Sequence, residues 1–245
     1  VERSRGLGDV YKRQLLVVCY VVAYLDRVNV GFAKLQMLQE LQFSETVYGL
    51  GAGIFFIGYF IFEIPSNIIL HKVGARVWIA RIMITWGIIS ACMMFVTSVH
   101  MFYALRFLLG AAEAGFFPGI ILYLTYWYPA ARRGRITTFF MTAVPMSGLI
   151  GGPISGWIMS TFHGDHGLSG WQWLFLLEGI PSVVIGVLVL IYLDDRINKA
   201  KWLTASEKAV LIRNIAAEEQ QKEDPPIRAA LTRPRVWAMA LIYFS

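Results

Sequence analysis

Residues 47–71 read VYGLGAGIFFIGYFIFEIPSNIILH, and the carboxyl of Glu63 is the only acidic or strongly basic group among them. An α-helix rises 1.5 Å per residue, so about 20 residues cross the roughly 30 Å hydrocarbon core of a bilayer. A strand of a membrane barrel needs only about 10 residues. The stretch therefore predicts a membrane-spanning helix.

Apolar runs of similar length recur along the chain and are rich in Leu, Ile, Met, Ala and Gly. They cover residues 15–36, 47–71, 77–97, 100–128, 136–161 and 171–193. Of the 245 residues, 57% are hydrophobic and only 16% are charged, whereas a soluble domain carries about a quarter charged residues. We predict an all-α membrane protein, with a bundle of six transmembrane helices over residues 15–193.

The segments outside this bundle are polar. Residues 1–14 lack the apolar core and cleavage site of a signal peptide, and we expect a non-native or disordered leader. Residues 194–235 are expected to form a linker. Within it, Thr204 followed by Glu207 predicts a capping box that opens an amphipathic helix. From residue 236 we expect a seventh helix, cut off at residue 245.

The Lys and Arg residues collect on one side of the predicted bundle. They cluster in residues 1–14, in the loops after the second and fourth runs, and in residues 194–235. On the other side, only Lys34 lies near a helix end. This asymmetry predicts a multi-pass protein of the bacterial inner membrane with a cytoplasmic N-terminus. The net charge of +6 is not spread along one polar face, which argues against a nucleic-acid partner.

Ionisable side chains inside spanning helices are costly and usually mark a pathway, a relay or a partner. The candidates are Asp26, Arg27, Glu63, Arg106, Glu113 and Glu178, with the polar Asn29 close to the first two. Arginine keeps its proton, whereas a carboxyl in a low dielectric can bind one near neutral pH. A fixed cation beside protonatable carboxylates is what the coupling of an anion to a proton requires.

These charges could also be buried pairs that only lock helices together. We interpret Arg27 and Glu113 as functional, and Asp26 and Arg106 as either functional or a locking pair. Glu63 and Glu178 lie near helix ends, and we interpret both as structural. The series Gly148, Gly152, Pro153 and Gly156 predicts a kink in the fifth helix, with either close helix packing or a hinge for alternating access.

Enzyme chemistry has no support in the sequence. It shows no metal-ligand cluster, nucleophile elbow or phosphate loop. Cys19 and Cys92 both lie in apolar runs without ligand partners at a suitable spacing. Charges in the middle of the spans also do not suit a passive pore. We therefore expect a transporter with neither a metal nor a cofactor.

Four motifs in order carry a resemblance to a known family. They are YLDRVNVGFA (24–33), GYFIFEIPSNIILHKVGARVWIARIMITWG (58–87), RFLLGAAEAGFFPG (106–119) and WLFLLEGIPSVVIGVLVLIYLDDRINKAKWL (173–203). With these motifs, residues 15–245 resemble the major facilitator superfamily, specifically its anion:cation symporter family of organic-anion permeases. The resemblance implies a twelve-helix fold of two halves, of which this chain is the N-terminal one and the C-terminal half is missing. Each half is implied to consist of inverted three-helix repeats, although no repeat is evident in the sequence itself.

The resemblance also implies roles for individual residues. Arg27 is expected to contact a substrate carboxylate near the midplane, with Tyr59 lining the pocket and Asn29 as a further substrate-binding residue. Asp26 and Glu113 are expected to be the protonation sites, with Arg106 as their partner. The implied activity is symport of a proton with a small carboxylate such as a hexonate, aldarate, tartrate or phthalate, driven by the proton gradient.

Two positions depart from the family pattern. His71 stands where the loop signature usually carries an aspartate, which leaves Lys72, Gly74 and Arg76 as its gating or structural residues. Val144, Met146 and Ser147 are less polar than in many sugar-acid carriers, which favours a less hydroxylated substrate. An efflux pump or antiporter of the same fold is the alternative, because Gly148–Gly156 resembles the antiporter glycine motif. The DRVN cluster and Glu113 favour import.

Overall fold

The computed structural model describes residues 2–128, 130–200, 203–219 and the single positions 232, 234 and 238. Within this part of the chain the regular elements are helices, as expected, and none is a strand. They are α1 (Glu2–Glu40), α2 (Glu45–Val73), α3 (Ala75–Cys92), η1 (Met93–Phe95), α4 (Val99–Glu113), α5 (Phe116–Trp127), α6 (Ala130–Met141), α7 (Ala143–Thr161), η2 (Asp165–Gly167), α8 (Gly170–Tyr192), η3 (Ile197–Lys199) and α9 (Ala205–Glu219).

In the part of the chain that the structure describes, five helical segments are long and apolar enough to cross a membrane. They are Gln14–Glu40, Glu45–Val73, Ala75–Phe95, Val99–Trp127 and Gly170–Tyr192, each within a few residues of a predicted span. The predicted fifth span, residues 136–161, is divided at Thr142 between α6 and α7. Large apolar side chains such as Phe60 (79% exposed) and Leu149 (78% exposed) lie on the outside of the bundle. Such a surface suits lipid or a second apolar body better than water.

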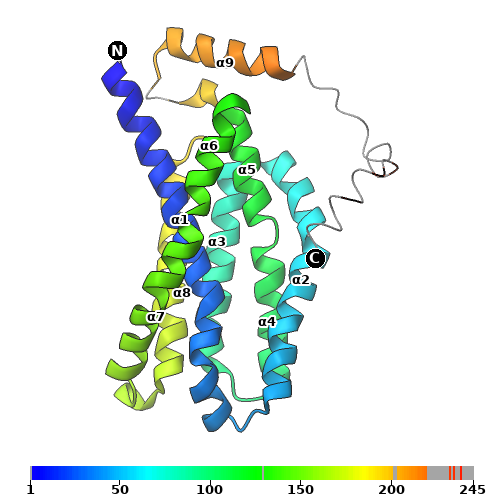
Figure 1. Cartoon of the computed structure of the whole chain (residues 1–245), viewed down its shortest axis with the longest axis vertical. Coiled ribbons are helices and arrows are strands. Elements are labelled where there is room, and N and C mark those ends of the chain that lie inside the picture. Colours follow the sequence, from blue (N-terminus) through cyan, green and yellow to red (C-terminus); the bar gives the residue numbers. More distant parts are fainter. Residues whose placement is uncertain are drawn as a thin grey trace.

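The long helices run side by side, and α9 lies across one end of the bundle (Figure 1). Two expectations about the ends need correction or remain open. Helix α1 begins at Glu2, so the backbone of residues 2–14 is helical, whereas a non-native origin of this leader stays a prediction. The expected seventh helix at residues 236–245 lies almost entirely outside the described residues.

The capping box at the start of α9 is confirmed. The Thr204 N–H donates to Glu207 Oε2 at 3.0 Å, and the Glu207 N–H donates back to Thr204 Oγ1 at 3.4 Å. Two N–H groups that no helical carbonyl can reach are satisfied in this way. The linker helix therefore begins where the sequence predicts.

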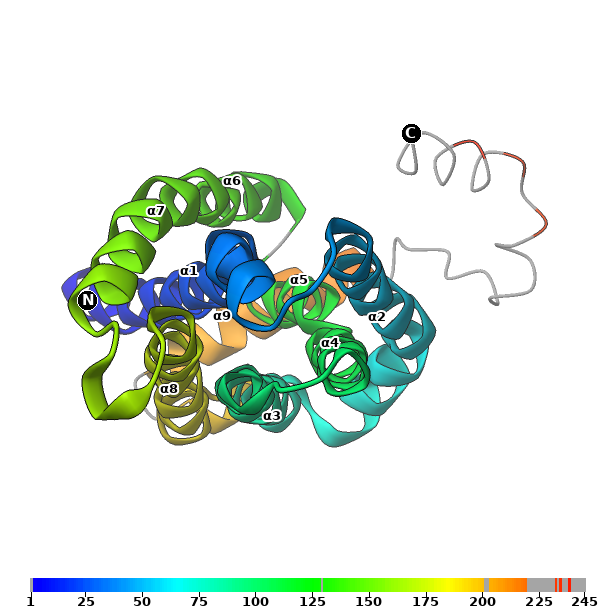
Figure 2. The ribbon, with the colours of Figure 1, turned by 90° about the horizontal axis from the view of Figure 1, so that it is seen from below.

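The helices pack in a symmetric pattern that the sequence letters do not reveal. Helix α3 packs on α8, α2 packs on α4, and α1 packs on both α7 and α8 (Figure 2). A repeat would relate α1 to α4, α2 to α7 and α3 to α8. Under this exchange the contact between α1 and α7 corresponds to that between α4 and α2, and the contact between α1 and α8 corresponds to that between α4 and α3. Both of the exchanged contacts occur in the structure. This is the arrangement that two three-helix repeats would produce.

Helices α2 and α4 touch through their backbones. A Cβ on Gly110 would lie 1.9 Å from the carbonyl oxygen of Phe55, and a Cβ on Gly58 would lie 2.3 Å from that of Phe107. Only glycine leaves room for this approach, which small residues permit in membrane helices generally. The contact fixes the depth of α4 against α2.

The fourth span is broken inside the bundle, between α4 and α5. Gly115 adopts φ +84°, and the Ala114 carbonyl has no helical donor because the residue four positions later is Pro118, which lacks an N–H. The Ser66 hydroxyl donates to this carbonyl at 2.6 Å, and the Trp78 indole N–H donates to Ser66 Oγ at 2.9 Å. Irregular backbone at membrane depth is tolerated where its polar groups find such partners in the protein. The break leaves Glu113 as the last residue of α4.

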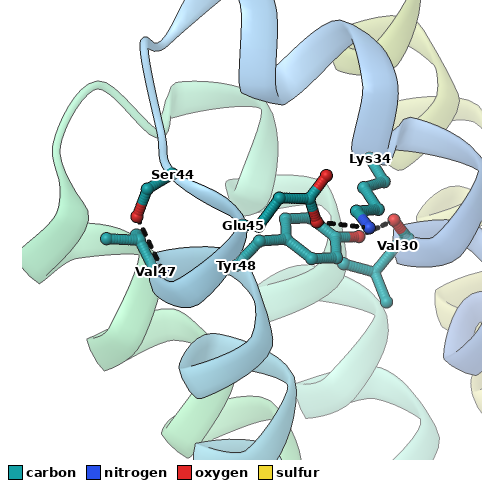
Figure 3. A network of polar contacts seen from close by, with 6 residues as sticks. All are labelled: Val30, Lys34, Ser44, Glu45, Val47 and Tyr48. Carbon is teal, nitrogen blue, oxygen red and sulfur yellow. Dashed lines mark hydrogen bonds and ion pairs between the residues drawn. The ribbon is translucent and has the colours of Figure 1, made fainter.

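A second polar network ties α1 to α2 at the end away from α9 (Figure 3). Lys34 pairs with Glu45 at 2.6 Å, and the Tyr48 hydroxyl donates to the Val30 carbonyl. Ser44 caps α2 by accepting from the Val47 N–H at 3.2 Å. These contacts hold together the ends of two helices that make few other contacts with each other.

Gly110→Ala should destabilise the bundle, because the new methyl group meets the backbone of α2. Overpacking of this kind costs about 1–3 kcal/mol. Gly53→Ala in α2 is the matched control, since nothing lies within 4 Å of its Cβ position and the helix gains roughly 0.5–1 kcal/mol from alanine. Thermal unfolding in detergent should show a lower Tm for Gly110→Ala and an equal or higher Tm for Gly53→Ala. Equal Tm values for the two variants would contradict the close contact.

Candidate functional site

Arg27 on α1 and Glu113 on α4 form an ion pair inside the bundle. The guanidinium of Arg27 lies 5.5–5.7 Å from the ring centres of Tyr24, Phe55 and Tyr59. These rings shield the charge and interact favourably with it. Tyr59 thus lies beside Arg27, and its role in lining a substrate pocket stays a prediction.

The two members of the pair differ in exposure. The side chain of Glu113 is 7% exposed, whereas that of Arg27 is 31% exposed. The Arg27 Nε–H has no partner in the protein, and a guanidinium can donate five hydrogen bonds in total. The Nε–H itself is buried, but 31% of the Arg27 side chain is exposed while Glu113 occupies Nη2, so the guanidinium keeps donors for a further acceptor.

Arg106 does not pair with Glu113, which corrects the expected partnership. Its Nε–H donates to the Gly51 carbonyl of α2 at 3.3 Å, and its guanidinium lies 4.8 Å from the Phe55 ring centre. The seven-residue spacing places Arg106 and Glu113 two turns apart on α4, and they interact electrostatically without direct contact. Arg106 instead contributes to the α2–α4 contact.

Asp26 lies on the other side of α1, away from Arg27. Its carboxylate accepts from the Ser90 hydroxyl at 3.1 Å, from the Ser182 hydroxyl and from the Asn29 amide at 3.4 Å. Arg106 is therefore not the partner of Asp26 either. Adjacent residues on a helix point about 100° apart, which is why Asp26 and Arg27 reach different neighbours.

Two residues occupy places that the sequence did not suggest. Asn29 is 1% exposed and points to Asp26, so the structure does not bring it to Arg27 and Tyr59 as expected. Glu178, interpreted as a helix-end residue, is only 6% exposed and accepts from the Ser155 hydroxyl at 2.9 Å. Its position near the end of a predicted helix did not indicate that Glu178 interacts with Asp26.

The short connection between α2 and α3 depends on Gly74. This residue has φ +100° and ψ 150°, a conformation that is essentially restricted to glycine. Next to it, the Arg76 N–H at the start of α3 donates to Asp195 Oδ1 at 2.8 Å. An acidic partner for this loop is thus present, but it comes from the end of the sixth span and not from position 71. The sequence contained this residue without indicating its role.

The glycines of α7 were expected either to pack closely against another helix or to form a hinge, and two of them make no close contact. Nothing lies within 4 Å of the Cβ positions of Gly148 and Gly156, and only the Phe32 ring lies near that of Gly152, at 3.7 Å. The helix continues through Pro153, and the break falls at Thr142 instead. Close packing within this chain therefore does not explain Gly148 and Gly156, and a hinge at these residues stays a prediction.

Metal chemistry finds no support in the site. Among the residues that the structure describes, no three or more His, Cys, Asp or Glu side chains are placed to hold a metal ion. What the site offers is a paired cation, protonatable carboxyls and aromatic walls.

Comparison with known proteins identifies the family. The family model described as Major Facilitator Superfamily matches residues 16–245. The chain belongs to the major facilitator superfamily. The relatives that it matches are named as transport proteins.

Relatives and solved structures agree with this assignment. A candidate metabolite transport protein named NicT from Pseudomonas putida is 60% identical over 94% of this chain, and a candidate tartrate transporter of Agrobacterium vitis is 58% identical over 94%. A protein of Acinetobacter baumannii named quinolone resistance transporter is 44% identical over 93%. The chain spans 53% of the length of each of these three. The inward-open xylose transporter XylE of Escherichia coli has a TM-score of 0.64 at 17% identity, covering 84% of this chain and 52% of XylE, and so shares the fold.

A double-mutant cycle should show that Glu113 is coupled to Arg27 more strongly than to Arg106. Replacing one member of a buried pair leaves the other charge unpaired, and replacing both removes that cost. We expect the unfolding free energies of Arg27→Leu and Glu113→Leu to be non-additive by about 0.5–3 kcal/mol. The matched cycle of Arg106→Leu with Glu113→Leu should show a smaller coupling. A larger coupling with Arg106 would contradict the observed pairing.

Proposed function

We propose that this chain is the N-terminal half of a proton-coupled importer of small organic anions. The observation that carries the proposal is the Arg27–Glu113 ion pair, enclosed by aromatic rings with Arg27 open on one side. Arg27 is a permanent cation that fits the two oxygens of a carboxylate. The Glu113 carboxylate pairs with this cation until a proton neutralises Glu113.

The coupling follows from the cost of an unpaired charge in a low dielectric. Without substrate, ionised Glu113 balances Arg27. When Glu113 binds a proton, Arg27 loses its partner, and a substrate carboxylate restores the balance by taking the place of Glu113. An anion therefore binds well only together with a proton, and it leaves when Glu113 ionises again.

The proposed substrates are hexonates, aldarates, tartrate or phthalate-like carboxylates. The relative named as a candidate tartrate transporter supports a small hydroxylated acid. On α7, the Ser147 hydroxyl already donates to the Ala143 carbonyl at 2.7 Å and lies 3.1 Å from that of Val21, while Val144 and Met146 are apolar. This part of the bundle offers few groups for sugar hydroxyls, which supports a substrate with few of them.

The same proposal includes the cellular setting. The connection between α2 and α3 lies at the same end of the bundle as α9 (Figure 1), and the sequence of this connection contains Lys72 and Arg76. The positive-inside rule places this end in the cytoplasm of a bacterium, with the chain in the inner membrane. The second six-helix half, the proton and the carboxylate substrate are the partners that this function requires.

Efflux or antiport by the same fold is the second candidate. It is supported by the 44% identical relative named quinolone resistance transporter and by the unpacked Gly148 and Gly156. The direction of proton movement distinguishes the two. In vesicles that hold the complete carrier, an importer moves protons inward together with the anion, whereas an antiporter moves them against it.

Arg27→Lys should abolish uptake although it preserves the charge. An ammonium group is a point charge and does not offer two parallel donors to a carboxylate. Tartrate uptake by the complete carrier should fall to background, while the amount of protein in the membrane stays normal. Near-normal uptake would show that Arg27 has only a structural role.

Glu113→Gln should separate exchange from accumulation. The amide resembles the protonated acid and cannot release a proton, so Arg27 stays available to the anion. We expect counterflow exchange to persist with less pH dependence, while uptake driven by a pH gradient is lost. Retained gradient-driven accumulation would exclude Glu113 as the coupling site. Loss of exchange together with a lower Tm would favour a purely structural pair.

A further inference from the structure

Asp26 and Glu178 lie together in a buried polar cluster between α1, α3, α7 and α8. Asp26 is fully buried and Glu178 is 6% exposed. The two carboxyls interact electrostatically, and the Asn29 side chain interacts with both. Two carboxyls that interact electrostatically in a buried site cannot both be ionised without a large cost.

The hydrogen bonds are divided unequally between the two carboxyls. Asp26 accepts from the hydroxyls of Ser90 and Ser182, whereas the Asn29 amide lies 3.4 Å from Asp26 and also interacts with Glu178. Glu178 accepts from Ser155 through Oε1, and its Oε2 has no hydrogen-bond partner. Hydrogen bonds to a carboxylate favour its ionised form, so the donors stabilise the charge on Asp26 rather than on Glu178.

A second buried acceptor without a hydrogen-bond partner also favours a proton on Glu178. Oδ1 of Asn29, a residue that is only 1% exposed, also lacks a hydrogen-bond partner. Unsatisfied buried acceptors are costly and uncommon in folded proteins. Two acceptors cannot satisfy each other, but a proton on Glu178 Oε2 converts one of them into a donor.

No basic side chain contacts the cluster within the described part of the chain. On α1, Arg27 is turned to Glu113, and Lys34 pairs with Glu45. Helix α7 has no ionisable residue, and on α8 the only one besides Glu178 is Tyr192, its last residue. The segment η1 consists of Met and Phe only.

The remaining neighbours of α1 and α8 do not supply a cation either. On α3, Arg76 lies in the first turn and Arg81 lies 3.9 Å from the Trp78 ring centre. On α6, Arg133 and Arg135 lie in the first turns. On α2, the lysine is in the last turn and the charge inside the span is Glu63. Besides Glu178, the charged group that acts on Asp26 is Glu113, which is also acidic.

We propose that Asp26 and Glu178 form a coupled carboxyl pair that holds one proton on Glu178, as a proton-binding site separate from the Arg27–Glu113 pair. The proton comes from water and converts the Glu178 carboxylate into the acid, which leaves Asp26 as the only charge of the cluster. The use of this site in transport rests on the function proposed above, whereas its existence does not. It gives the carrier a second proton site that no anion needs to contact.

Infrared spectroscopy of the purified chain in lipid vesicles tests the pair directly. Protonated carboxyls absorb apart from carboxylates, so their absorption can be followed as the pH is raised. The wild type should keep a protonated-carboxyl absorption at neutral pH, and Glu178→Gln should lose that component. Glu63→Gln, the same substitution on α2 away from the cluster, should keep it. An unchanged spectrum in Glu178→Gln would overturn the proposal.

Asp26→Asn tests the coupling between the two groups. Without the neighbouring charge, the absorption of Glu178 should reach half intensity at a pH lower by about one unit or more. Ser155→Ala keeps the carboxyl and removes its donor, so half intensity should move to higher pH, and this variant serves if Glu178→Gln does not fold. An unchanged midpoint in either variant would contradict the pair. If the titration behaves as expected while the complete carrier transports anions without protons, the proposed function fails and the pair stands.

Discussion

A charge inside a lipid-facing bundle must be balanced by a partner, and this constraint organises the interior of the chain. Arg27 is balanced by Glu113 across the α1–α4 contact, and aromatic rings surround the pair. Asp26, the neighbour of Arg27 in sequence, is stabilised by neutral donors on the other side of α1. Since a permanent cation and a protonatable group share one site, neutralising the group exposes the cation to a new anion. The proposed transport cycle follows from this single relation.

The same low dielectric governs the backbone that positions these side chains. Glu113 can end α4 inside the bundle only because Ser66 satisfies the freed carbonyl of Ala114. Its height relative to α2 is set by the contact of Gly110 with the Phe55 backbone, which no larger residue permits. Uncharged residues next to Glu113 in space thus determine whether its carboxylate reaches Arg27.

Much of the fold could be predicted from the sequence because lipid requires long apolar runs, and five of these match spans of the structure closely. The break at Thr142 was missed because a division within a helix leaves the hydropathy pattern unchanged. The sequence also showed which ionisable residues lie inside the spans, since a charged side chain in lipid is costly and therefore rare. Their partners were not: spacing along α4 suggested Arg106 for Glu113, yet the nearer guanidinium comes from α1. Contacts between helices, such as those of Glu178 with Ser155 and of Asp195 with Arg76, depend on rotation and depth that a linear pattern does not specify.

The central claim is that an anion takes the place of Glu113 on Arg27 only when Glu113 binds a proton. Proton uptake during substrate binding measures this most directly. Tartrate would be added to the purified complete carrier in a weakly buffered solution above neutral pH, with a pH indicator present. The account predicts that the solution becomes more alkaline as the anion binds, and that this change disappears in Glu113→Gln although binding persists. Anion binding by the wild type without any proton uptake would contradict the account.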